Sequence, residues 1–227
     1  MMIARNAFLF VGSPKGLKSS SQALGDALAS RLETGGMTVN KMVVGAALHS
    51  AVGQAKMHEA VEAADLIIFS FPLYVDQLPA PMIRAAELIA ERRRSHPHAG
   101  PQKIMAIVQC GFPETRQNQP ARDIMREFAR EAGFGWAGAL LMGMGGAVNG
   151  RPLEKAGGML RNVVRALDIA AAALLRGEDV PGEAERLMGI PFIPKWMYRR
   201  IGDWGFRRQA KKHGVRDKLY ERPYEGK

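Results

Sequence analysis

Short apolar segments alternate with longer segments of helical periodicity along most of this 227-residue chain. The short segments have the length of strands, and 66–71 is a continuous apolar run of the kind that a strand buried on both faces needs. We expect strands over 7–11, 38–44, 66–71, 104–108 and 136–142, and helices over 20–34, 53–64, 80–94, 121–132 and 153–175. Five such units predict an open, doubly wound parallel sheet with helices on both faces, because they are too few for an eight-stranded barrel.

The composition supports a globular α/β protein and excludes several other classes. Hydrophobic residues make up 47% of the chain, which is enough for one large core and excludes a disordered or fibrous protein. The single cysteine, Cys110, excludes an intramolecular disulfide and a cysteine-ligated zinc or iron–sulfur site within one chain. No histidine or carboxylate pattern has metal-ligand spacing, and no segment has the length of a membrane span. We therefore expect a cytoplasmic protein without a metal.

The positive charge of the chain is concentrated near its C-terminus. The formal net charge is +10, but residues 190–227 hold 11 Lys and Arg against 4 Asp and Glu. The same segment holds seven of the sixteen aromatic residues. The net positive charge is therefore a local property of the C-terminal segment, and it does not indicate that the whole chain is a nucleic-acid-binding domain. We expect a domain over 1–180 and a basic, aromatic C-terminal helical extension over 181–227.

A candidate anion-binding loop, residues 12–22, lies between the first predicted strand and the first predicted helix. Amide groups at a helix start, serine hydroxyls and the positive end of the helix dipole together bind a doubly charged anion without a metal. The serines of the loop are Ser13, Ser19, Ser20 and Ser21. The loop lacks the glycine patterns of nucleoside triphosphate and dinucleotide sites, which favours a monophosphate. The alternative is a flexible Ser/Gly turn with an N-cap serine.

Two other predicted loops lie at the same edge of the sheet. Residues 72–81, after the third strand, are rich in proline and apolar side chains and predict a stiff shelf on which Tyr74 stacks against a planar ring. The alternative is a proline-rich crossover into the next helix. The glycine-rich residues 143–150, after the fifth strand, either border the substrate side of the site or form a flexible connection.

In these motifs the sequence resembles the flavodoxin-like superfamily, specifically its branch of NAD(P)H-dependent FMN reductases and quinone reductases. The matching parts are Gly12-Ser13-Pro14-Lys15 with Ser19-Ser20-Ser21, and the block from Ala64 to Tyr74. The resemblance covers about residues 5–176. It implies a flavodoxin-like sheet of five parallel strands in the order 2-1-3-4-5. The cysteine cluster of the iron–sulfur flavoproteins in this superfamily is absent.

The resemblance also implies a binding site for FMN, with NAD(P)H as co-substrate. The phosphate of FMN would lie in the loop 13–22 and its ring against 72–76, with the loop after the fourth strand closing the site. The residues assigned to FMN in this way are Ser13, Lys15, Ser19, Ser20, Ser21, Gln22, Pro72, Leu73, Tyr74, Val75, Asp76, Cys110, Gly111 and Phe112. No catalytic side chain is assigned, because the flavin carries the hydride chemistry. Cys110 is expected to be a small buried residue and not a nucleophile.

These features predict an FMN-dependent oxidoreductase that transfers hydride from NAD(P)H to a quinone, a flavin or another small acceptor, and that forms a homodimer. The alternative is a non-catalytic module of the same fold, either a flavin-binding electron carrier or a protein that docks on a partner or a membrane. Electron carriers of this fold are usually acidic, which counts against that version for a chain of net charge +10.

The C-terminal extension has four competing interpretations. Met197, Ile201 and Trp204 follow a helical spacing after Pro194, with arginines around them. The predicted helix packs on its own domain or a dimer partner, makes a peripheral contact with an anionic membrane, screens nucleic-acid phosphates, or remains a solvated tail that attracts NAD(P)H. No groove-reading motif accompanies it, so we expect no specific binding of nucleic acid.

Overall fold

The computed structural model describes residues 5–97, 100–222 and 224–225. Within these, the chain divides into two compact units, one ending at Ile190 and the other beginning at Pro191. Helix α7 (Gly182–Met188) belongs to the first unit, where it packs on helix α6 (Arg161–Leu175). The observed division therefore lies ten residues beyond the boundary expected after residue 180.

The first unit is built on a five-stranded parallel sheet. Its strands are β1 (Asn6–Val11), β2 (Thr38–Val43), β3 (Leu66–Pro72), β4 (Lys103–Gln109) and β5 (Gly135–Met142). The strand order is β2-β1-β3-β4-β5, and every pair is parallel, which confirms the predicted topology. All seven residues of β3 are buried, as its continuous apolar run predicts for a central strand.

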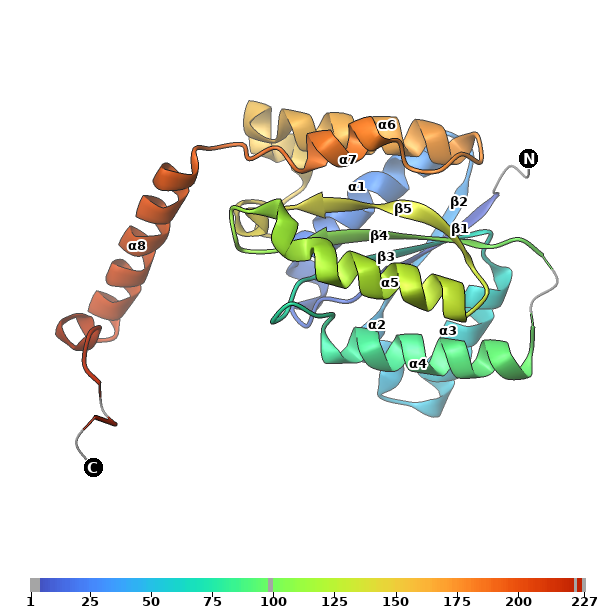
Figure 1. Ribbon diagram of the computed structural model, residues 1–227, viewed down its shortest axis with the longest axis horizontal. Coiled ribbons are helices and arrows are strands. Elements are labelled where there is room, and N and C mark those ends of the chain that lie inside the picture. Colours follow the sequence, from blue (N-terminus) through green and yellow to red (C-terminus); the bar gives the residue numbers. More distant parts are fainter. Residues whose placement is uncertain (1–4, 98–99, 223, 226–227) are drawn as a thin grey trace. The chain divides into compact units, whose positions relative to one another are not determined.

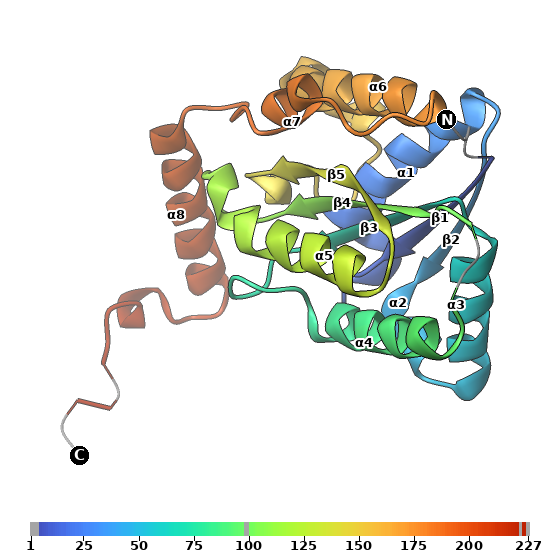
Figure 2. The ribbon, with the colours of Figure 1, turned by 45° about the vertical axis from the view of Figure 1, so that its right-hand side comes forward.

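Helices cover both faces of the sheet (Figures 1 and 2). One face carries α1 (Ser20–Thr34) with α6 and α7. The other carries α2 (Val44–Leu48), α3 (Ala51–Ala63), α4 (Ala80–Ser95) and α5 (Gln119–Glu131). On this second side Phe10 and Phe69 stack with ring centroids 5.2 Å apart, within a cluster that includes Met57 and Met82. On the first side Leu9 lies against α1 at Gly25.

The structure differs from the expected elements in two places. The chain forms the short helix α2 directly after β2, where a loop was expected. The single helix expected over 153–175 is wrong, because a 3₁₀ segment (Leu153–Leu160) precedes α6. Gly157 adopts a φ of 62° inside that segment, and a left-handed residue interrupts a right-handed helix.

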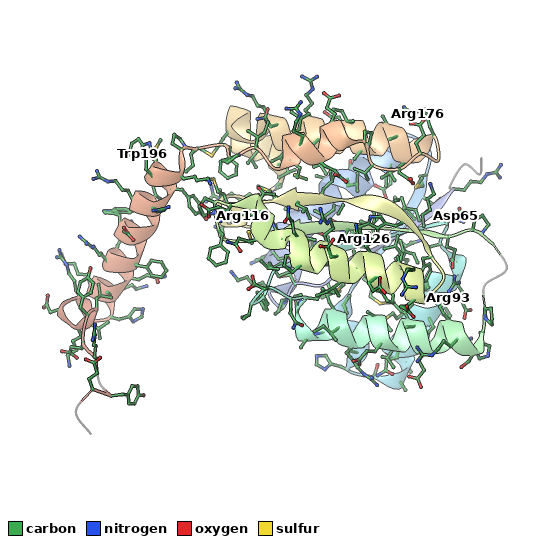
Figure 3. All side chains as sticks on the ribbon, viewed as in Figure 1. Asp65, Arg93, Arg116, Arg126, Arg176 and Trp196 are labelled. Atoms are coloured by element: carbon green, nitrogen blue, oxygen red, sulfur yellow. The ribbon has the colours of Figure 1, made fainter. Side chains whose placement is uncertain are left out.

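The amino-terminal edge of the sheet is closed by polar side chains. Asp65 accepts hydrogen bonds from the amides of Arg5 and Asn6, at 2.8 and 3.0 Å (Figure 3). Arg93 is buried, lies 4.2 Å over the ring of Phe134 and donates to the side chain of Gln102 at 2.7 Å. Burial lowers the pKa of Arg93, and its hydrogen bonds offset the cost of burying its charge. These contacts hold the edge opposite the predicted site.

The second unit consists mainly of helix α8 (Lys195–Lys212), followed by a 3₁₀ turn (Arg216–Lys218). The helix begins after Pro194, as expected from the sequence. It ends because Gly214 turns left-handed with a φ of 68°, and the amide of Val215 then bonds back to the carbonyl of Ala210 at 2.9 Å. Across the described ranges, no helix is long and apolar enough to cross a membrane.

Candidate functional site

The loops after β1, β3, β4 and β5 meet at the carboxyl edge of the sheet. Register places the ends of β3, β4 and β5 side by side, since Pro72 pairs with Gln109 and Gln109 with Met142. Backbone hydrogen bonds then continue between the loops, from Leu73 to Gln109, from Cys110 to Met142 and from Gly145 to Cys110, at 2.8 to 3.1 Å. The loops therefore form a connected surface, as an open parallel sheet requires for a ligand site.

A pocket of about 210 Å³ opens between these loops. Nine of the fourteen residues predicted to bind FMN line it: Ser13, Lys15, Ser19, Ser20, Pro72, Leu73, Tyr74, Cys110 and Gly111. They come from three loops that are widely separated in the sequence. The structure thus brings most of the predicted residues together at one pocket.

The start of helix α1 supplies the polar side of this pocket. The hydroxyl of Ser19 caps the helix by accepting a hydrogen bond from the amide of Gln22 at 3.1 Å. The first intrahelical bond runs from the amide of Ala23 to the carbonyl of Ser19. The amides of Ser20 and Ser21 precede that bond, so neither has a partner within helix α1. With the exposed ammonium group of Lys15, they make this side of the pocket electropositive.

The loop after β5 packs directly on the loop after β1. The hydroxyl of Ser20 donates to the carbonyl of Gly145 at 2.7 Å. Gly150 has a φ of 68°, and a Cβ atom there would overlap the carbonyl of Lys18. Gly146 joins the pocket wall. The glycine-rich segment therefore borders the site, and its glycines allow the two backbones to approach closely.

The loop after β3 ends in a tight turn beside the pocket. The amides and carbonyls of Tyr74 and Gln77 bond to one another at 2.9 and 3.1 Å. Between them, Val75 and Asp76 both adopt left-handed conformations, with φ of 49° and 58°. This conformation is strained for a β-branched residue, and Val75 is 95% exposed. The turn leaves the ring of Tyr74 at the rim of the pocket, 44% exposed.

Five predicted residues lie outside the pocket wall. Ser21 is fully buried beneath it, where its hydroxyl accepts a hydrogen bond from Gln109 at 3.3 Å. Gln22 faces a second pocket, of about 390 Å³, that also contacts Asp26 and Leu153. The others are on the surface: Val75 and Asp76 at the turn, and Phe112, which is 56% exposed. For these five, flavin contact stays a prediction.

Cys110 is a buried thiol, as expected. Its sulfur lies 3.6 Å from the carbonyl of Phe112, and burial raises the pKa of the thiol. The side chain therefore keeps its proton at neutral pH and lacks the thiolate character of a nucleophile. In the described part of the chain, no group of three His, Cys, Asp or Glu residues could hold a metal ion.

Two buried side-chain amides contribute to the site, and the sequence analysis did not identify either of them. Gln109 lines the pocket and bonds to Ser21, while Asn118 donates to the carbonyl of Met142 at 3.0 Å. Gln109 carries a signal that could have identified it, because it is a polar residue at the end of an apolar strand. Asn118 lies in the 3₁₀ segment Thr115–Asn118 and carries no such signal. Arg116 of the same segment is at this edge (Figure 3).

The all-parallel sheet with the strand order β2-β1-β3-β4-β5 decides the fold. It is flavodoxin-like. Solved structures with this fold include an apo NADH:FMN oxidoreductase, with a TM-score of 0.58 and 13% identity over 80% of this chain and 94% of that one. An FMN-dependent NADH-azoreductase from Bacillus anthracis, in complex with FMN, has a TM-score of 0.53 and 8% identity over 75% and 99%.

A third solved structure with this fold is an NAD(P)H:quinone oxidoreductase from Methanothermobacter marburgensis, with a TM-score of 0.52 and 16% identity over 73% and 96% of the two chains. At these identities the likeness concerns the fold alone. No protein-family model and no curated protein matches the sequence.

Proposed function

We propose that this chain is an FMN-dependent oxidoreductase that takes hydride from NAD(P)H and passes it to a quinone, a flavin or another small acceptor. One observation carries the proposal: the pocket at the carboxyl edge combines an electropositive helix N-terminus with an aromatic rim. The first suits a phosphate and the second a planar ring. FMN has both, joined by a short polar chain.

The residues present fit FMN in two respects, one for its phosphate and one for its ring. The donors at the start of α1 are backbone amides and a lysine, which are the groups that bind a phosphate dianion without a metal. The pocket is smaller than the roughly 300–1,000 Å³ that encloses a whole drug-sized ligand. The ring would therefore lie at the rim, where Tyr74 is exposed.

The chain's own residues have binding and positioning roles in this proposal. When bound, FMN supplies the hydride chemistry. Lys15 and the amide of Ser20 hold the phosphate, and Tyr74 contacts the ring. Cys110 keeps its proton, because burial raises its pKa, and so places no charge beneath the ring. Three solved structures with this fold support this function. They are named as an FMN-dependent NADH-azoreductase, an NAD(P)H:quinone oxidoreductase and an NADH:FMN oxidoreductase.

The first test is binding of FMN and riboflavin to the purified protein, measured by flavin fluorescence quenching. We expect binding of FMN to exceed that of riboflavin, because only FMN presents a phosphate to α1. Lys15→Ala should weaken FMN binding about tenfold and leave riboflavin binding unchanged. Lys56→Ala, which removes an exposed lysine from α3, is the matched control. A protein that binds neither flavin would contradict the proposal.

The second test is steady-state oxidation of NADH and NADPH by the FMN-loaded protein with a soluble quinone. Turnover that depends on added FMN supports an oxidoreductase. Flavin binding without any oxidation of either nicotinamide would instead identify a non-catalytic flavin-binding module.

A further inference from the structure

Helix α8 exposes an apolar stripe that its own unit does not cover. At 100° per residue, Met197, Ile201 and Trp204 lie along one side of the helix. Ile201 and Trp204 are more than half exposed, at 55% and 63%, and only Ala210 of the whole helix is buried. Exposing large apolar side chains in line costs free energy in water, so the stripe indicates a binding surface.

More cations lie around this stripe than on the opposite side of the helix. The half of the helix centred on the stripe carries Arg200, Arg207, Arg208, Lys211 and Lys212 and no acidic residue. The opposite half carries Lys195, Arg199 and the single acid, Asp203. The guanidinium of Arg208 lies 5.4 Å over the ring of Trp204, which places charge and aromatic surface on the same side.

We propose that α8 is a docking helix for anionic phospholipid membranes, lying in the plane of the interface. Interfacial helices combine Trp and aliphatic residues on one face with Lys and Arg that contact lipid phosphates. On the side of the stripe, α8 combines aliphatic residues and Trp204 with cations and no acidic residue, and its charges prevent it from crossing the bilayer. The proposal concerns the second unit and does not depend on flavin binding by the first.

Charge complementarity favours lipid over the other partners. Residues 1–189 carry 21 Lys and Arg against 18 Asp and Glu, so a second copy of the chain offers no net negative surface to this helix. A nucleic acid would pair with the cations. It would leave the aliphatic side chains of Met197 and Ile201 in water, because phosphates make no apolar contacts. A membrane interface satisfies both sets of side chains.

The experiment uses the full chain and vesicles of phosphatidylglycerol mixed equally with phosphatidylcholine, compared with phosphatidylcholine alone. We expect cosedimentation with the anionic vesicles only, weakened by high salt. Tryptophan fluorescence should shift to the blue on binding, because two of the three tryptophans of the protein lie in α8. Failure to bind anionic vesicles at physiological salt would overturn the proposal.

Matched pairs of variants test which side of α8 contacts the vesicles. Each cation near an anionic surface contributes about fivefold in affinity, so Arg200→Glu should weaken vesicle binding roughly tenfold or more. Arg199→Glu makes the same change on the opposite side and should have a much smaller effect. Trp204→Ala should weaken binding about tenfold, while Phe206→Ala, at an exposed ring on the opposite side, should not. Equal losses from the members of either pair would overturn the proposal.

Two competition measurements separate the other partners. A DNA duplex that binds more tightly than the anionic vesicles, at the same salt, would replace the lipid proposal with nucleic-acid binding. The second measurement is sedimentation equilibrium. If the wild type forms a dimer that Trp204→Ala dissociates, and if the wild type does not bind vesicles, then a second copy of this chain is the partner. A wild-type protein that prefers vesicles, with self-association unchanged in Trp204→Ala, supports lipid docking.

Discussion

The hydroxyl of Ser20 donates a hydrogen bond to the carbonyl of Gly145, 2.7 Å away, and so joins the start of α1 to the loop after β5. The two residues are 125 positions apart in the sequence. Through this bond and the packing of Gly150 on Lys18, the first and last loops of the sheet edge support each other. The pocket between the loops therefore depends on contacts that no single segment contains.

Ser20→Ala should lower the free energy of unfolding by about 1 kcal/mol, because it removes this partly buried hydrogen bond. Ser30→Ala is the control on the same helix, at an exposed position where alanine favours the helix slightly. Urea denaturation measures both. A Ser20→Ala protein as stable as the wild type would show that water replaces the bond at no cost.

Gly150→Ala should lower the free energy of unfolding by about 1–3 kcal/mol, because Gly150 has a positive φ and its new Cβ would overlap the backbone of Lys18. Gly45→Ala, in helix α2 with open space around it, should leave stability unchanged or raise it slightly. Thermal and urea unfolding of the two variants tests the close approach, and equal effects would contradict it.

Val75→Gly should raise the free energy of unfolding by roughly 1 kcal/mol. Val75 is exposed, so the substitution loses little packing, and glycine adopts a φ of 49° without strain. The same substitution at Val52, an exposed valine in helix α3, should instead lower stability by about 0.5–1 kcal/mol. A loss of stability at both positions would show that Val75 is not strained.

Tyr74→Ala should weaken FMN binding about tenfold if the ring of Tyr74 contacts the flavin, because an aromatic contact of this kind contributes about 1 kcal/mol or more. Tyr74→Phe keeps the ring and should retain most of the affinity. Fluorescence quenching titrations measure both variants. If Tyr74→Phe binds FMN as weakly as Tyr74→Ala does, the hydroxyl of Tyr74 and not its ring contributes to FMN binding.

The stability of the protein should fall as the pH rises above the ordinary thiol pKa of 9.0, partly because of Cys110. Burial raises the pKa of Cys110 in the folded protein. Above pH 9 the unfolded chain releases its thiol proton while the folded protein keeps it, so the free energy of unfolding decreases.

Cys110→Ala should lack this contribution. The free energy of unfolding of the wild type, taken relative to that of Cys110→Ala, should therefore decline between pH 8 and pH 10 in urea titrations. A difference that stays constant over this range would mean that the pKa of Cys110 is the same in the folded and unfolded states.

Local sequence patterns predicted most of the fold. Apolar runs such as Leu66–Pro72 form buried strands, and α1 runs from Ser20 to Thr34 as expected. These features depend on neighbours in the sequence, which periodicity and capping residues reveal. The short helix α2 and the interruption at Gly157 were not foreseen, because each depends on a few residues with no periodic signal.

The sequence alone determined the order of strands and helices and which loops reach the carboxyl edge, because parallel strands all present that end together. Only the tertiary structure decided which of those residues share a pocket. It turned Gln22 and Phe112 away, buried Ser21, and brought in Gln109 and Gly146. The physical reason is that these placements rest on hydrogen bonds and packing between distant segments, such as Gln109 to Ser21 and Ser20 to Gly145.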